Sequence, residues 1–188
     1  HDQTGAPIDP QPGNIPGGPR DVLRGADFNN GTASGFVPDV GTWEVSGGRY
    51  SVSPTTSGGD AVSVFYVDKV LPQYFEVRAT ISTAKPIAGV KANAYIIFDY
   101  QSPTSFKFAG FDDSRDKLQI GARDANGWRI LVETPAQLKS DTDYNVLLSI
   151  NGTNATLVQG GRSLTYTFAA RVDADGFRYG LNAGLVGL

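Results

Sequence analysis

Short stretches in which apolar and polar residues alternate recur along the chain from about residue 22 onward, and turn residues separate them. In the stretch Tyr144–Asn151, for example, Val146, Leu148 and Ile150 fall on one side of an extended backbone, because successive side chains of a strand point to opposite faces. No useful length of sequence repeats with the period of a helix. The pattern predicts strands at residues 35–37, 43–45, 49–52, 60–65, 73–81, 92–100, 106–112, 117–124, 128–133, 144–151, 154–158, 163–168 and 180–186.

The turns between these strands indicate hairpins. Asn151-Gly152 favours the tight type I′ turn that joins antiparallel strands, and Gly47-Gly48 links two more. Turn residues at 112–116 and 124–127 make 92–133 a predicted four-strand antiparallel meander. Strands with one apolar and one polar side are stable when two sheets stack with their apolar sides together. The sequence therefore predicts an all-β, two-sheet antiparallel β-sandwich.

Composition divides the chain and narrows its possible partners. Residues 1–19 are rich in Pro and Gly and predict a linker, which leaves 20–188 as the sandwich domain. The net charge is -3, and no run of Lys or Arg offers a patch for nucleic acid. No segment has the ~18 apolar residues needed to cross a membrane. The chain contains no Cys and starts at His1 without a signal peptide, which suggests a processed or truncated start.

Several segments occur in an informative order: GTWEVSGGRYSV (41–52), YFEVRATI (74–81) and FDYQSPTSFKFAGFD (98–112), followed by KLQIG. In that order the sequence resembles bacterial concanavalin A-like lectin and glucanase modules, which are laminin-G-like and often belong to large adhesins. The resemblance spans about residues 27–188. It implies a jelly-roll sandwich, a secreted or cell-surface location, and neighbouring domains or copies in a longer protein. It says less about activity, because one fold hosts many functions.

The end of the sequence departs from this pattern. Modules of this kind usually finish with a strand similar to F-D-N-V-x-V, whereas this sequence stops at Leu188. We therefore expect the sandwich to lack its closing strand, which would leave unpaired backbone groups along an edge. Two explanations stay open: the sequence is a fragment, or another chain or a neighbouring copy supplies the strand.

The residues needed for catalysis are also missing. Laminarinase-like members carry E-x-D-x-E on one strand, where the two-residue period gathers three carboxylates on one face. The three glutamates of this chain, Glu44, Glu76 and Glu133, lie on separate predicted strands. The single histidine is His1, so a nucleophile in the domain would have no histidine base. We expect a protein that is not an enzyme.

Aspartates at turns suggest calcium, which prefers oxygen ligands. The resemblance places a structural Ca²⁺ near the first and last strands, and in this sequence that implies Asp27, Asn29 and, nearby, Asp60. The alternative is that these residues only stabilise turns.

The meander supplies the candidate ligand surface. Strict alternation places Lys107 on the same face as Phe111, and Tyr100 on the face opposite Tyr95. We expect a concave face that binds its ligand through Asp99, Lys107, Phe111, Gln119, Arg123 and Arg129. For each aromatic residue of the meander the alternative is packing in the core, and for the polar residues it is a solvated sheet face.

Together these observations predict a non-catalytic binding or adhesion module of a larger bacterial surface protein, whose ligand is a glycan or a peptide. A structural subunit of a surface fibre, assembled by strand complementation, is the alternative, and a glycoside hydrolase is a third and less favoured one. Nucleic acid and membrane insertion are not expected.

Overall fold

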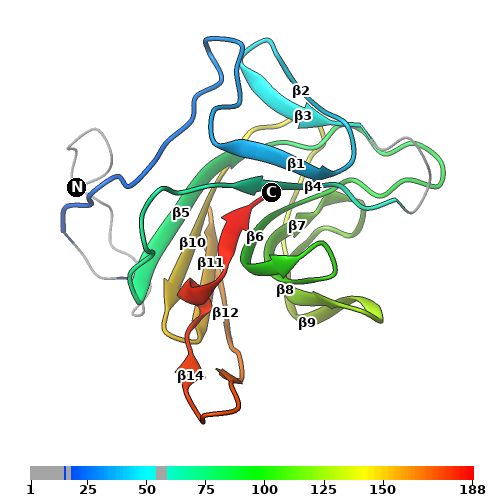
Figure 1. The fold of residues 1–188 in the computed structure, drawn as a ribbon. Helices are drawn as coiled ribbons and strands as arrows, with labels where there is room; N and C mark the ends of the chain where they lie inside the picture. The colour runs from blue at the N-terminus through cyan, green and yellow to red at the C-terminus, as the bar shows by residue number, and fades with distance from the viewer. Residues whose placement is uncertain (1–14, 16–17, 54–58) are drawn as a thin grey trace.

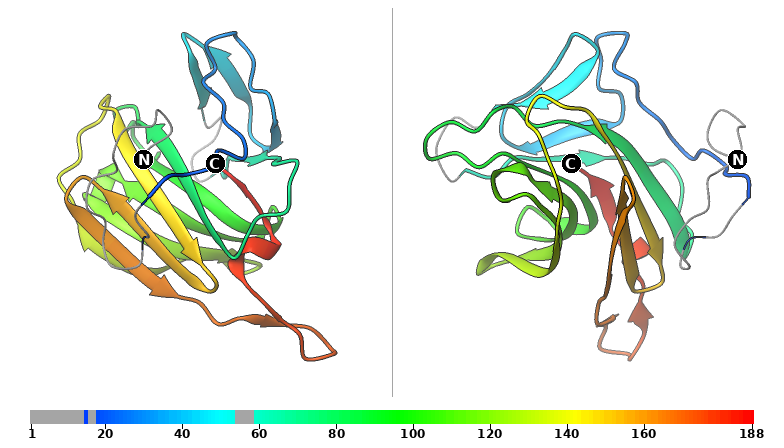
Figure 2. Two further views of the ribbon diagram at one scale, coloured as in Figure 1. Left: turned by 90° about the vertical axis from the view of Figure 1, so that its left-hand side faces the viewer. Right: turned by 180° about the vertical axis from the view of Figure 1, so that it is seen from behind.

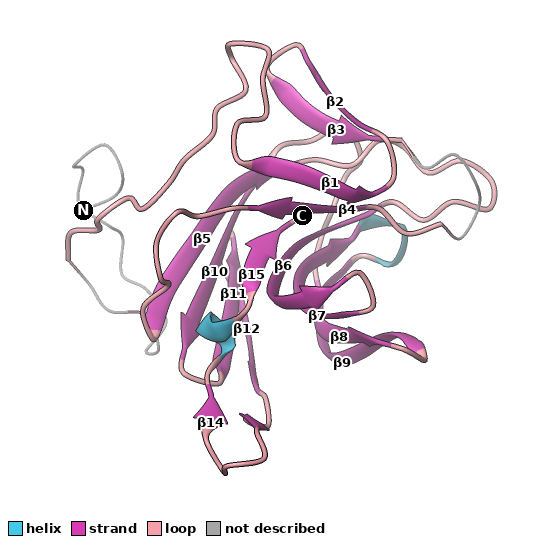
Figure 3. Cartoon of the chain, in the orientation of Figure 1, coloured by secondary structure: helices cyan, strands magenta, loops and turns pink. Residues whose placement is uncertain are grey.

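Two antiparallel sheets lie face to face in the computed structural model, which describes residue 15 and residues 18–53 and 59–188 (Figures 1 and 3). The larger sheet has seven strands in the order β1-β4-β15-β6-β7-β8-β9, and the smaller has four in the order β12-β11-β10-β5. The large-sheet strands are β1 (Phe36–Val40), β4 (Val62–Phe65), β6 (Asn93–Ser102), β7 (Ser105–Asp112), β8 (Lys117–Asp124), β9 (Gly127–Pro135) and β15 (Leu185–Gly187). The small-sheet strands are β5 (Tyr74–Ile81), β10 (Tyr144–Asn151), β11 (Asn154–Gln159) and β12 (Arg162–Thr167).

Two hairpins and two short 3₁₀ turns complete the described chain. The hairpins are formed by β2 (Trp43–Ser46) with β3 (Arg49–Val52), and by β13 (Arg171–Val172) with β14 (Arg178–Tyr179). The 3₁₀ turns are η1 (Asp113–Arg115) and η2 (Leu181–Ala183). No helix of the described residues is long and apolar enough to cross a membrane.

The predicted sandwich is confirmed, and β3, β8 and β10 have the predicted bounds. The meander is confirmed as β6-β7-β8-β9. The two-residue strands β13 and β14 were not predicted, since two residues carry no periodic signal. The predicted linker, residues 1–19, falls almost entirely outside the described residues, so its boundary stays a prediction.

The expectation of a missing closing strand is wrong. β15, at the end of the sequence, pairs with β4 through Val186↔Phe65 and with β6 through Leu185↔Tyr100. It therefore fills the place between these two strands, which the order of the sheet would otherwise leave open. The predicted strand 180–186 misplaced this element, because its first part forms η2 and only the last residues are extended.

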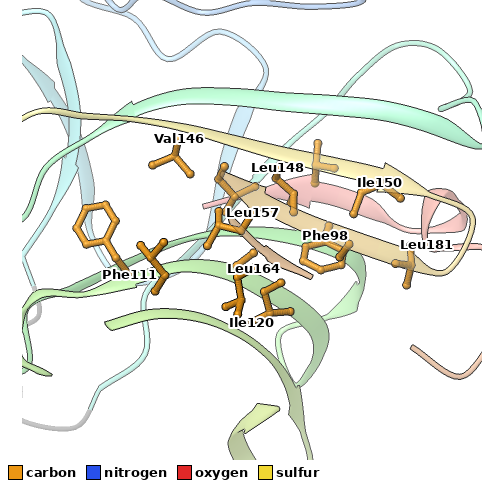
Figure 4. Close-up of a cluster of buried hydrophobic side chains, with 14 of the residues drawn as sticks. Phe98, Phe111, Ile120, Val146, Leu148, Ile150, Leu157, Leu164 and Leu181 are labelled. Atoms are coloured by element: carbon orange, nitrogen blue, oxygen red, sulfur yellow. The ribbon is translucent and has the colours of Figure 1, made fainter. Parts of the chain in front are cut away.

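The main core lies between the two sheets (Figure 4). Alternate residues of facing strands meet there, for example Phe98 of β6, Ile120 of β8, Leu148 of β10 and Leu157 of β11, all fully buried. Burying a side chain of this size stabilises the fold by roughly 1.5–3 kcal/mol. This apolar layer holds the two sheets together. Because these residues point inward, the residues that alternate with them point outward and can line a site.

Candidate functional site

The seven-stranded sheet is apolar on both sides. Side chains that point away from the four-stranded sheet form a second buried cluster, on what we call the outer face. Nearly continuous apolar runs in β6 and β7 explain this, because such runs are typical of strands covered on both faces. The buried members of the second cluster are Val62, Val64, Ile97, Tyr100, Phe106 and Phe108.

The sheet curls around its outer face (Figure 1). Trp128 of β9 donates a hydrogen bond from Nε1 to Oδ1 of Asp60 at 2.7 Å, and Asp60 lies just before β4. Five strand spacings separate β9 from β4 in the sheet order, which would be about 24 Å in a flat sheet. The hydroxyl of Tyr100 on β6 likewise donates to Asp39 on β1. These contacts across the sheet show that the outer face is concave.

Trp128 is the most exposed aromatic side chain of this face. Its ring centroid lies 4.8 Å from that of Phe108, 5.4 Å from Phe106 and 6.0 Å from Tyr95. With the hydrogen bond to Asp60, these contacts fix the orientation of the indole, while 38% of the residue stays exposed. An aromatic plane held in this way can stack on an apolar ring face without a large loss of conformational freedom.

A chain of hydrogen bonds runs beside the aromatic residues. The Tyr95 hydroxyl donates to Oε1 of Gln119 at 2.6 Å, and Nε2 of Gln119 donates to Oε2 of Glu133 at 2.9 Å. Arg115 lies 3.4 Å and Lys117 3.9 Å from Oε1 of Glu133. Burial, helped by the carboxylates of Asp112 and Glu133, raises the pKa of Tyr95 well above its usual value. Tyr95 therefore stays protonated and keeps donating at neutral pH.

A second polar pair lies next to Trp128. Nε of Arg123 donates to Oδ2 of Asp60 at 3.3 Å, while Oδ1 of Asp60 accepts from Trp128. Both oxygens of this carboxylate thus position groups of the outer face. The Arg123 side chain is 15% exposed and that of Asp60 is 29% exposed, so both reach solvent at the edge of the aromatic cluster.

Two glycines let the aromatic rings lie flat on the sheet. A Cβ at Gly110 would lie 2.2 Å from the carbonyl oxygen of Ala94 and 3.0 Å from the Tyr95 ring. A Cβ at Gly121 would lie 2.4 Å from the Phe108 ring. Any larger residue at either position would push these rings out of place.

An open hollow of about 360 Å³ adjoins the hydrogen-bonded chain at the edge strand β9. Ile130 is 39% exposed there, beside the partly exposed Glu133. The residues that line the hollow are Arg115, Ile130, Leu131, Val132 and Glu133. Apolar surface and hydrogen-bonding groups thus lie together on one accessible face, as in many ligand sites.

Of the six predicted ligand residues, only Gln119 and Arg123 lie on this face. Phe111 is fully buried in the main core, so the prediction that it faces a ligand is wrong. Lys107 is on the same side as Phe111, as alternation predicted, but that side faces the core. It forms an ion pair with Asp99 at 2.5 Å, and its ammonium lies 5.4 Å from the Phe168 ring.

Two bulges explain the other misplacements. In β9 the register shifts beside Leu131, so that Glu133 pairs with Gln119 on the outer face while Arg129 pairs with Ala122 on the opposite side. Arg129 forms an ion pair with Asp124 at 2.9 Å. A bulge shifts every later side chain to the other face, which strict alternation cannot foresee.

The second bulge is in β6 at Asp99, which has a φ of 46°. It places Tyr100 in the same cluster as Tyr95, not on the opposite face as alternation predicted. Asp99 is itself buried against Lys107. Tyr95 and Trp128 were not among the predicted ligand residues, and packing in the core was the alternative for both. The signal that could have found them is the apolar residues on both sides of β6 and β7, which indicate that a second face is covered.

The candidate calcium ligands have other partners. Oδ1 of Asp27 accepts a hydrogen bond from the backbone of Asn29 at 3.1 Å, a turn contact. Both oxygens of Asp60 are used by Trp128 and Arg123. Within the described ranges, no three His, Cys, Asp or Glu side chains gather where they could hold a metal ion. Calcium binding stays a prediction.

The outer face of the four-stranded sheet is closed by an ionic network. Glu76 of β5 is paired with Arg20 at 2.7 Å and Arg78 at 3.0 Å, and the Tyr74 hydroxyl donates to it at 2.6 Å. Its side chain is only 6% exposed. Burial opposes ionisation of this carboxyl, but hydrogen bonds from Arg20, Tyr74 and Arg78 outweigh burial and lower its pKa.

Comparison with solved structures finds the same fold in another protein. The structure is similar to the carbohydrate-binding module CBM66 from Bacillus subtilis, with a TM-score of 0.61 and 12% sequence identity over 81% of this chain and 85% of that one. No protein-family model and no curated protein matches the sequence. The likeness confirms the predicted concanavalin A-like sandwich, whereas membership of a particular adhesin family stays a prediction.

Proposed function

We propose that this protein is a non-catalytic carbohydrate-binding module that holds a neutral glycan on the concave outer face of the seven-stranded sheet. Trp128 carries the proposal, because it is an aromatic plane that is fixed on one side and exposed on the other. Sugar rings present apolar C–H faces that stack on such planes. The fold shared with a carbohydrate-binding module supports the proposal without deciding it.

The polar groups of the outer face suit hydroxyl groups. Glu133, Arg115 and Arg123 supply donors and acceptors around the apolar surface, whereas Gln119 is only 1% exposed and orients Glu133 from below. The positive groups are paired with carboxylates, Arg115 with Glu133 and Arg123 with Asp60. Since no sign of charge dominates, the face favours an uncharged ligand over a strongly anionic one.

The open shape of the face favours a stretch of glycan chain over an isolated sugar. Two exposed residues, Trp128 and Ile130, and the partly exposed Glu133 follow one another along the edge strand β9. From Trp128 to Glu133 a strand extends about 16 Å, enough for several sugar rings. Affinity should therefore increase with oligosaccharide length until this surface is covered.

A binding role agrees with the positions of the acidic residues. Glycoside hydrolysis usually requires two carboxyl groups close together. Glu44 and Glu133 lie on β2 and β9, and Glu76 on β5 is enclosed by two arginines. A secreted or cell-surface location and a structural calcium ion belong to the proposal as well. Melting curves with calcium and with a chelator would test the ion.

The decisive experiment measures binding to a panel of neutral and acidic polysaccharides by affinity electrophoresis, followed by calorimetry with oligosaccharides of increasing length. We expect Trp128→Ala to reduce affinity at least tenfold while the protein stays folded. Phe177→Ala, which removes a still more exposed aromatic side chain from the β13–β14 hairpin, should bind as the wild type does. Binding that survives Trp128→Ala, or no binding to any polysaccharide, would contradict the proposal.

A further inference from the structure

The β13–β14 hairpin projects beyond the sandwich (Figures 1 and 2). It carries two exposed apolar side chains. Phe177 is 61% exposed and Val172 is 51% exposed. Isolated apolar residues are common on protein surfaces, but a phenyl ring at the end of a projecting hairpin can enter an apolar hollow of another molecule.

The end of this hairpin is held in one conformation. Oδ1 of Asp173 accepts hydrogen bonds from the backbone of Asp175 at 3.0 Å and of Phe177 at 2.9 Å, and Oδ2 accepts from the Tyr179 hydroxyl at 3.0 Å. The hydrogen bond from the Phe177 backbone is the main reason that the pKa of Asp173 is lowered. The guanidinium of Arg171 lies 4.3 Å from the centre of the Tyr179 ring. Because the hairpin is already ordered, Phe177 can bind elsewhere at a low entropic cost.

The same chain contains a hollow of matching chemistry, which we call the apolar hollow. It has a volume of about 150 Å³, a size at which an apolar cavity accommodates a benzene ring. Nδ2 of Asn182 donates to the carbonyl of Leu71 at 2.9 Å and ties its two walls together. It is lined by Phe65, Val67, Lys69, Val70, Leu71, Asn182, Gly184, Leu185 and Val186.

We propose that Phe177 of one copy inserts into the apolar hollow of a second copy. Phe177 is exposed in its own chain and does not line this hollow. The turn that ends in Phe177, residues 173–177, contains two acidic residues and no basic one, while Arg171 and Arg178 lie on the two strands of the hairpin. The one charged residue in the lining of the hollow is Lys69, so the acidic turn suits it. Because the two surfaces differ, copies can join head to tail, and two copies can also insert their hairpins into each other reciprocally.

The contact is small and the association is correspondingly weak. One hairpin end and one hollow bury less surface than the roughly 1,200 Å² of a stable interface. Copies therefore remain separate when dilute and associate when they are concentrated or attached side by side. The proposal is independent of carbohydrate binding, which uses the outer face.

Sedimentation velocity over a concentration series, from micromolar to about 1 mM, tests the proposal. We expect the average sedimentation coefficient of the wild type to rise with concentration, and Phe177→Ser and Val70→Asp to abolish the rise. Val70 is 94% exposed, so its replacement should not impair folding. Ile87→Ser removes another exposed apolar side chain, 70% exposed and outside both surfaces, and should behave as the wild type does. A wild type without concentration dependence, or an unchanged rise in Phe177→Ser, would overturn the proposal.

Engineered cysteines give a second and independent measurement, since the chain contains none. A protein with Asp175→Cys, which keeps Phe177, and a protein with Val70→Cys are mixed in equal amounts under mild oxidation. Random collision gives twice as many mixed pairs as pairs of either protein with itself, and we expect disulfide-linked mixed pairs in clear excess over this twofold ratio. Mixed pairs at the random ratio would also overturn the proposal.

Discussion

The outer faces of the two sheets differ in how they satisfy their polar groups. On the four-stranded sheet, Glu76 is enclosed by Arg20, Arg78 and Tyr74, and only 6% of its side chain is exposed. On the seven-stranded sheet, polar groups are arranged around aromatic rings, and Trp128 stays 38% exposed. The same two-residue alternation thus produces a closed ionic surface on one side of the molecule and an open aromatic surface on the other.

This difference separates stability from binding. The interactions of Glu76 are saturated within the chain, so a ligand gains little by approaching them. The network around Glu133 and Asp60 reaches solvent, so it can exchange water for a ligand. Substitutions on the first face should therefore change the free energy of unfolding alone, and substitutions on the second should change ligand affinity as well.

The largest expected effect is that of Glu76→Ala. It leaves Arg20 and Arg78 without the carboxylate they share, and the free energy of unfolding should fall by about 2–3 kcal/mol in denaturant titrations. Glycan affinity should not change. Glu44→Ala, on the exposed surface of β2, is the control and should stay within about 0.5 kcal/mol of the wild type.

The contribution of Glu76 also depends on pH. Its pKa is lowered in the folded protein, so the folded state holds the proton more weakly than the unfolded chain does. The contribution is complete above the ordinary pKa of a glutamate and is lost as the pH falls through that value and then through the lower folded value. The stability difference between wild type and Glu76→Ala should therefore shrink in acid. A difference that stays constant down to strongly acidic pH would show that the carboxylate charge is not responsible.

Asp60→Ala should have the next largest effect and should change both properties. It removes the acceptor for Trp128 and Arg123, and we expect a loss of about 2 kcal/mol in the free energy of unfolding. Because the indole is then less firmly held, glycan affinity should fall several-fold in calorimetry. Asp68→Ala, an exposed aspartate between β4 and β5, is the control. Lower stability with unchanged affinity would mean that Asp60 does not position Trp128 for a ligand.

Asp112→Asn should stabilise the protein at neutral pH by about 1 kcal/mol, because it removes a negative charge that burial opposes, on a carboxyl with one buried oxygen that has no hydrogen-bond partner among the described residues. Burial raises the pKa of Asp112, so the folded state holds the proton more tightly than the unfolded chain does. The wild type therefore loses stability as the pH rises through the ordinary pKa and then the folded pKa. Thermal unfolding should show a gain for Asp112→Asn at neutral pH that disappears below the ordinary pKa. The same gain at both pH values would contradict a charge effect.

Regular alternation was enough to predict most of the fold. The core residues of β10 and β8, such as Leu148 and Ile120, occur where the two-residue period places them, and the Asn151-Gly152 turn joins β10 to β11. The last strand was predicted at residues 180–186, too early, because β15 has only three residues and follows the turn η2. What marks it is its two-sided pairing, which is a property of the whole sheet.

The candidate site was harder to predict, because it depends on two irregularities. The bulges at Asp99 and beside Leu131 move Tyr100 and Glu133 to the outer face and Arg129 away from it. The contact between Trp128 and Asp60 depends on the curl of the sheet, which joins residues far apart in the strand order. Alternation within one strand contains neither kind of information.

Tyr95→Phe should have the smallest effect and gives the finest test of the open face. The variant keeps the ring above Gly110 and removes only the hydroxyl that donates to Gln119. We expect a loss of about 0.5–1 kcal/mol in the free energy of unfolding. Glycan affinity should fall about twofold (close to 0.4 kcal/mol), because Gln119 then orients Glu133 less firmly. Tyr66→Phe, with a side chain on the surface, is the control and should change neither quantity. Since the pKa of Tyr95 is raised, wild-type affinity should also stay constant from neutral pH to about pH 10, where an ordinary tyrosine is half ionised. An affinity that falls over this range in the wild type but not in Tyr95→Phe would show that the hydroxyl ionises, and that the network is more open to water than its burial indicates.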